Sequence, residues 1–194
     1  MLWRPFYESR RVLRVKINHI MTTLDDLKLD LKALKEGHTQ LSLELEDAFF
    51  EALEEADLKK GHVHLNIDVE RTGDYYELLF HTEGYVVVPC DLCLDEMRQP
   101  VVADNRLTVK LGDEYKEDDD LVVVPEEDAI FDAAWNVYEY IALSVPIRHV
   151  HAPGKCNPAM MKILEEHSAA RSGEGNAEQP VDPRWAALGK LKLE

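Results

Sequence analysis

The sequence lacks any long hydrophobic run and any complete catalytic motif, and these absences narrow the classes of protein that it can encode. No segment approaches the roughly 20 consecutive apolar residues that a membrane-spanning helix needs. The first twenty residues hold arginines but no apolar stretch of signal-peptide length, so we expect neither export nor a membrane partner. Serine-hydrolase, phosphate-loop and zinc-protease motifs are missing too, so we expect no enzyme activity.

Basic residues are scarce compared with acidic ones. The chain has 22 lysines and arginines against 38 aspartates and glutamates, which gives a net charge of −16. Residues 1–20 carry five basic side chains and one acidic one, a net +4, so the remainder carries −20. Such an acidic body repels phosphate backbones, because nucleic-acid affinity depends on cations that neutralise phosphates. The charge favours a basic protein as partner instead.

Cysteine is rare, and all three cysteines fall into one pattern with a histidine. Cys90 and Cys93 form a Cys-x-x-Cys pair after the run VVVP, and His151 and Cys156 follow in HAPGKC. The first pair can direct two thiolates at one ion, and a second pair from elsewhere completes a tetrahedron. The spacing predicts a structural zinc site of the Cys3His type, with His149 as the alternative imidazole ligand.

Two other interpretations of these cysteines stay open. They could be reduced thiols without a metal, or Cys90 and Cys93 could be a redox pair, because a thioredoxin-type Cys-x-x-Cys also follows a strand. Against the redox pair, Asp91 lies between the two cysteines and is expected to raise a thiol pKa rather than lower it. A catalytic zinc is disfavoured because four protein ligands leave no position for water.

The order of periodic segments predicts an α+β fold, with a mainly antiparallel sheet or partly closed barrel and C-terminal helices. Period-two alternation predicts strands around residues 27–31, 41–45, 63–69, 75–89, 105–112 and 121–125. The strand at 75–89 is expected to bend or break at Gly84. Helical spacing predicts one helix after residue 47, another between Asp132 and Pro146, and a third that begins at Asn157–Pro158.

Composition divides the chain into four parts. Residues 1–20 are expected to be a basic N-terminal extension, either disordered or the product of a start assigned upstream of Met21. Residues 21–170 are expected to form a single α+β domain that contains the Cys/His knuckle. Residues 171–181 lack large apolar side chains and predict a flexible linker, and residues 182–194 predict a short C-terminal helix.

Several motifs occur in an order that resembles the YceD family, the large ribosomal RNA subunit accumulation proteins. They are Cys90-x-x-Cys93, FDAAWNVYEYIALSVPI, His151-x4-Cys156 and DPRWAALGKLK, and they span roughly residues 24–194. The resemblance implies a soluble cytoplasmic protein that is needed for accumulation of large-subunit ribosomal RNA, with no catalytic residues to carry over. Many members have a second cysteine pair where this chain has His151 and Cys156.

The favoured function is therefore a non-catalytic ribosome assembly factor that binds a basic ribosomal protein or a large-subunit assembly intermediate. A run of acidic residues is the candidate partner-binding segment: Glu117, Asp118, Asp119 and Asp120. Direct contact with ribosomal RNA is an alternative, through Arg184, Lys190 and Lys192. A second alternative is a redox or metal-responsive regulator that uses the Cys-x-x-Cys pair.

Overall fold

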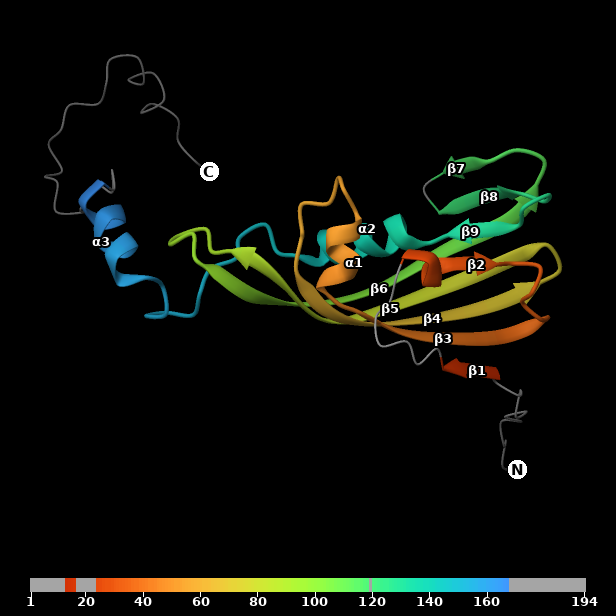
Figure 1. Cartoon of the computed structure of the whole chain (residues 1–194), viewed down its shortest axis with the longest axis horizontal. Helices are drawn as coiled ribbons and strands as arrows, with labels where there is room; N and C mark the ends of the chain where they lie inside the picture. Colours follow the sequence, from red (N-terminus) through yellow and green to blue (C-terminus); the bar gives the residue numbers. More distant parts are fainter. Residues whose placement is uncertain (1–12, 17–23, 119, 168–194) are drawn as a thin grey trace, which may run out of the picture. The chain divides into compact units, whose positions relative to one another are not determined.

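An open seven-stranded sheet is the frame of the computed structural model, which describes residues 13–16, 24–118 and 120–167. The strand order is β1-β3-β4-β5-β6-β8-β7 (Figure 1). The strands are β1 (Leu13–Lys16), β3 (Gly37–Leu45), β4 (Gly61–Thr72), β5 (Tyr75–Pro89), β6 (Glu96–Gly112), β7 (Lys116–Asp118) and β8 (Leu121–Pro125). Two neighbouring pairs are parallel, β1 with β3 and β6 with β8, and the others are antiparallel. The predicted α+β class with a mainly antiparallel sheet is confirmed, and the sheet does not close into a barrel.

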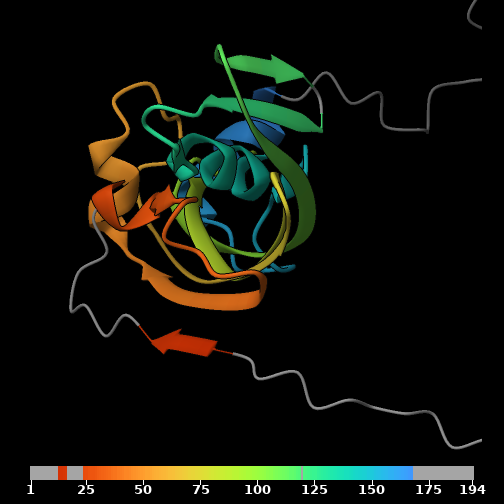
Figure 2. The same cartoon turned by 90° about the vertical axis from the view of Figure 1, so that its right-hand side faces the viewer.

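The hydrophobic core lies on one face of this sheet. Figure 1 shows that the elements on this face are α1 (Asp47–Ala52), α2 (Ala134–Ser144), the 3-10 helix η1 (Leu24–Leu27) and the two-stranded sheet of β2 (Lys28–Asp30) and β9 (Ile130–Asp132). Figure 2 shows α2 in the hollow of the curved sheet. In β3, the alternate residues Leu41, Leu43 and Leu45 are buried, whereas the residues between them are partly or fully exposed. Period-two alternation therefore decides which side of each strand enters the core.

Helix α2 forms where its sequence predicts it. The Asp132 carboxylate accepts the backbone N–H of Ala134 at 3.0 Å, which satisfies one of the free donors of the first turn. Val137 and Ile141, four residues apart, are fully buried on one side of the helix. The helix ends at Ser144, two residues before Pro146.

The chain divides into two compact units, Met1–Asn157 and Pro158–Glu194. Helix α3 (Pro158–His167) is the described part of the second unit and begins at the predicted proline. The predicted domain boundary at residue 170, the linker at 171–181 and the helix at 182–194 lie outside the described residues. Among the described residues, no helix is both long and apolar enough to cross a bilayer.

Part of the basic extension pairs with the sheet. Residues Leu13–Lys16 form β1, which lies parallel to β3 with Leu13 opposite Thr39 and Lys16 opposite Ser42. The alternation in the sequence did not predict this strand. It also missed β7, β9 and the first half of β6, which are short or carry few buried apolar residues.

Strand β5 runs without interruption through Gly84, which corrects the predicted break. Gly84 lies opposite Val63 on β4 and Val101 on β6. A Cβ at this position would lie 2.2 Å from the carbonyl oxygen of His62 and 2.7 Å from the Cα of Val63. The glycine therefore allows β4 and β5 to approach closely within one continuous sheet.

We expect Gly84→Ala to lower the free energy of unfolding by roughly 2–3 kcal/mol, because the added methyl group overlaps backbone atoms that cannot rotate away. Chemical denaturation checks this. Val102→Ala, at an exposed position of the neighbouring strand, is the control and should change the stability little. Equal stability of both variants would show that the two strands separate without cost at Gly84.

Candidate metal centre

The first half of the site is the turn between β5 and β6. The backbone N–H of Cys90 donates to the carbonyl of Asp95, and the N–H of Leu94 donates to the carbonyl of Cys90, both at 2.9 Å. Leu94 has a left-handed conformation, with φ of 63°. These contacts fold the residues after Pro89 into a tight knuckle in which Cys90 and Cys93 are both buried.

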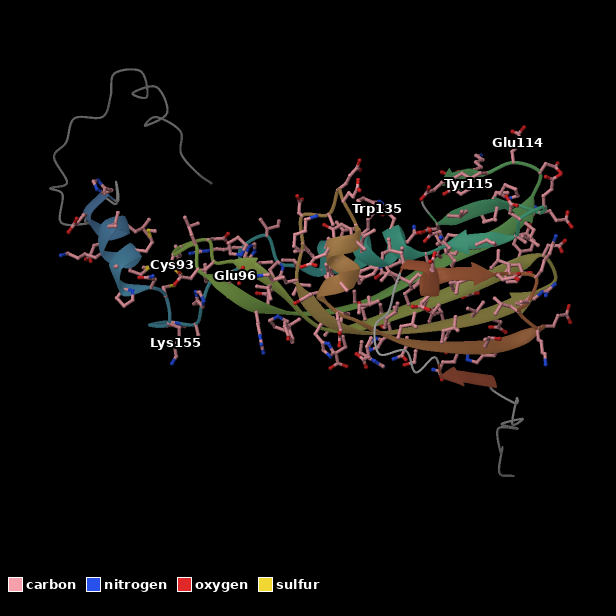
Figure 3. All side chains as sticks on the ribbon, viewed as in Figure 1. Cys93, Glu96, Glu114, Tyr115, Trp135 and Lys155 are labelled. Atoms are coloured by element: carbon pink, nitrogen blue, oxygen red, sulfur yellow. The ribbon has the colours of Figure 1, made fainter. Side chains whose placement is uncertain are left out.

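The second half is the loop that follows α2. Gly154 has φ of 77°, which glycine adopts without steric cost. The N–H of Lys155 donates to the carbonyl of Ala152 at 2.9 Å, so the chain turns back between His151 and Cys156. Figure 3 labels Cys93 on the knuckle and Lys155 on this loop, at the same end of the long β5–β6 hairpin.

The four predicted ligands come together in one cluster. Donor atoms of Cys90, Cys93, His151 and Cys156 all lie within 4.8 Å of one another. The distances are 3.9 Å between the Sγ atoms of Cys90 and Cys156, 3.3 Å from Cys93 Sγ to His151 Nδ1, and 4.0 Å from Cys156 Sγ to that nitrogen. Tetrahedral zinc would separate two sulfurs by about 3.7 Å, and a sulfur from a nitrogen by about 3.6 Å. The cluster could hold a metal ion, and three sulfurs with one imidazole fit the ligand preference of zinc.

The environment changes the acidity of two of these thiols in opposite directions. Burial by itself would raise the pKa of Cys90, but hydrogen bonds from the backbone N–H groups of Cys93, His151 and Leu92 and from the His151 ring lower it to about 6. Burial, and then the hydrogen bonds and charges of the other two cysteines, raise the pKa of Cys156 to about 11. The negative charge of the other two sulfurs therefore opposes ionisation of Cys156, and a cation among them would favour it.

Asp91 lies between the two cysteines of the knuckle, where the sequence predicted that it would raise a thiol pKa. The thiol pKa at Cys90 is lowered, not raised, because backbone N–H groups contact that sulfur. The Asp91 carboxylate instead accepts the backbone N–H of His149 at 2.7 Å. The backbone N–H of Asp91 also donates to the carbonyl of His149 at 3.0 Å. Asp91 therefore joins the knuckle to the second loop.

His149 is not the imidazole of the cluster, which corrects its place as the alternative ligand. Its Nδ1 lies 3.0 Å from the carbonyl oxygen of Pro146, and its Nε2 lies 3.6 Å from the Asp91 carboxylate. The structure assigns the imidazole to His151. A further link between the loops, which the sequence did not predict, is the 3.2 Å hydrogen bond from the Asn157 side chain to Asp95.

The candidate partner-binding residues lie on other elements. Glu117 and Asp118 belong to the exposed edge strand β7, and Asp120 precedes β8. The Tyr115 hydroxyl donates to Glu117 at 2.8 Å, and Figure 3 labels Tyr115 at the end of the hairpin away from Cys93. Asp119, Arg184, Lys190 and Lys192 lie outside the described residues.

The fold and the site define an α+β domain in which a Cys3His cluster joins a hairpin tip to a later loop. The sequence model of the family described as large ribosomal RNA subunit accumulation protein YceD matches residues 78–192. The chain belongs to this family. The matched segment contains all four cluster residues. No curated protein and no solved structure matches the chain.

We expect that removal of a bound metal with a strong chelator lowers the free energy of unfolding by roughly 2–4 kcal/mol, because the ion closes a loop between Cys93 and His151. Denaturation of the loaded and the stripped protein, together with elemental analysis, measures this difference.

Cys156→Ser is the matched control, because it removes one ligand from the more exposed position of the cluster. It should bring the untreated protein close to the stability of the stripped parent, and the chelator should then change little. A parent protein purified without metal and equally stable with or without added zinc would contradict the prediction.

We expect Asp91→Ala to weaken metal affinity by about tenfold, because the carboxylate that positions the second loop is lost. Competition with a chromogenic chelator measures the affinity. Glu96→Ala removes one negative charge from a residue that pairs with Lys60 and should leave the affinity unchanged. Equal losses in both variants would indicate a general effect of charge instead of positioning.

Proposed function

We propose that the protein is a non-catalytic factor that supports the accumulation of large-subunit ribosomal RNA by binding a basic protein of the assembling subunit. The family to which the chain belongs is named for large ribosomal RNA subunit accumulation. The observation that carries the choice of a protein partner is the net charge of −16. Such a charge attracts basic proteins and repels bare RNA.

The metal in this proposal is zinc, and its role is structural. Three cysteine sulfurs and one imidazole nitrogen would complete a tetrahedral set around zinc, and no ligand position would then be left for water or substrate. Both cysteines of the knuckle are buried. The ion would hold the tip of the β5–β6 hairpin against the loop after α2, and it would give the surface around them a fixed shape.

The acidic charge is dense around β7 and β8. Within the described residues, the carboxylates of this region are Asp113, Glu114, Glu117, Asp118, Asp120, Glu126, Glu127 and Asp128. The three residues of β7 are exposed to solvent. We assign to this segment the long-range attraction of the partner, since exposed charges act mainly on the rate of encounter. The same charge disfavours the alternative of direct contact with ribosomal RNA.

We expect the zinc-loaded protein to bind at least one purified basic protein of the large subunit, and to bind protein-free large-subunit RNA much more weakly at physiological salt. Biosensor titrations of both ligands across a range of salt concentrations test this. Saturable RNA binding with a steep salt dependence, and no binding to any basic protein, would replace the proposal with direct RNA recognition.

The control for the role of charge is the combined variant Glu117→Gln, Asp118→Asn and Asp120→Asn. At low salt it should associate with the basic partner several-fold more slowly, while its dissociation rate stays unchanged. At high salt, where screening removes the long-range field, variant and parent should associate equally. Faster dissociation would mean that these side chains contact the partner directly.

A further inference from the structure

One long edge of the sheet is covered over only part of its length. Strand β3 pairs with β4 along all nine of its residues. On its other side, β1 pairs only with Thr39–Ser42. Within the part of the chain that the structure describes, the segment from Leu43 to Leu45 has no strand on that side. An edge of this kind offers backbone donors and acceptors to a further strand.

The strand that covers this edge is short and parallel to β3, and both features favour its displacement. It has four residues, it lies parallel to β3, and no tight hairpin turn fixes its register. Parallel pairing is slightly weaker per residue than antiparallel pairing, and a parallel strand needs a long connection. The pairing therefore has the properties of a reversible contact.

The solvent face beside this edge is acidic. By the strand register, the carboxylates on this face of β3 to β6 are Glu44, Asp68, Glu70, Glu77, Glu83, Glu96 and Asp104, against the cations Arg98, Arg106 and Lys110. Seven negative and three positive groups leave a net −4 if histidines are neutral. Close to the edge, Glu44 is half exposed and lies 2.7 Å from His64. Asp68 lies 3.3 Å from His38.

The sequence of β1 indicates which kind of strand suits this edge. Its residues Leu13-Arg14-Val15-Lys16 alternate apolar with basic side chains. By the register, Arg14 lies opposite Gln40 and Lys16 opposite Ser42. Both positions of β3 belong to its solvent side, the side that carries Glu44. An incoming strand of this pattern would bring cations to the acidic face and apolar residues to the core side.

We propose that the side of β3 away from β4 binds an extended basic strand of a protein partner, and that β1 occupies part of this side until the partner displaces it. Backbone hydrogen bonds to β3 give the affinity, and the acidic face selects basic strands over others. This inference rests on the proposed function, since it names the docking surface for the basic protein. The partner would then be recognised by strand addition to the sheet edge, as well as by long-range attraction between charges.

The test uses the full chain and a synthetic peptide of residues 10–19, RRVLRVKINH. The variant Arg14→Pro with Val15→Pro prevents β1 from pairing, because proline lacks the N–H that a ladder needs. Fluorescence anisotropy should show that this variant binds the peptide at least about tenfold more tightly than the parent, since a tethered competitor has been removed. A peptide of the same composition in scrambled order should bind more weakly to the variant.

Gln40→Lys, added to the proline variant, places a cation on the solvent side of β3 and should abolish the gain. Thr108→Lys, on the solvent side of β6 where this strand pairs with both β5 and β8, is the matched control and should keep it. Equal binding by parent and proline variant, equal binding of the scrambled peptide, or self-association of the proline variant in place of peptide binding would each overturn the inference.

The same variants separate this inference from the proposed function. If a basic large-subunit protein binds parent and Gln40→Lys equally, the docking surface is wrong and the function stands. If the peptide binds as described but no basic large-subunit protein binds any variant, the edge accepts a strand and the function is wrong.

Discussion

The rest of the structure depends on the antiparallel pairing of β5 with β6, which runs from Tyr75 opposite Lys110 to Pro89 opposite Glu96. At one end this hairpin belongs to the core, where Tyr76 and Phe80 are buried. At the other end it continues beyond β4, whose last pairing is Gly61 with Val86. The tip is therefore a two-stranded ribbon, and such a ribbon is only marginally stable in water unless it packs against something else. The loop after α2 supplies that support.

Hydrogen bonds between the knuckle and the loop contribute part of this support. Asp91 contributes two and Asp95 one, and partly exposed bonds of this kind are each worth about 1 kcal/mol. The contribution of the sulfurs depends on their charge. Hydrogen bonds lower the pKa of the Cys90 thiol, whereas burial and the other two cysteines raise the pKa of the Cys156 thiol. A divalent ion at this site would attract the thiolates and hold both loops. In our proposal the order of the tip is coupled to metal binding, whereas the sheet folds on hydrophobic packing.

Sequence patterns predicted those features that are set by local periodicity or by residue type. The alternation around Leu43 predicted β3 and its buried side, and the cysteine spacing predicted the members of the cluster. Features that depend on contacts between distant segments could not be predicted from these patterns. The choice of His151 over His149 follows from where Asp91 holds the second loop. The uninterrupted β5 at Gly84 follows from how closely β4 approaches.

The β7 edge and the β3 edge of the sheet are protected by different means. At β7 every residue is charged and exposed, and charged side chains on a very short strand discourage pairing with another chain. At β3 the alternate residues Leu41 and Leu43 enter the core, so the strand cannot carry charge on that side without losing burial. Protection of this edge falls to a short strand from the same chain. Fixed charges cannot leave the β7 edge, whereas a four-residue strand can leave β3, so in our proposal the β3 edge combines protection in isolation with access for a partner.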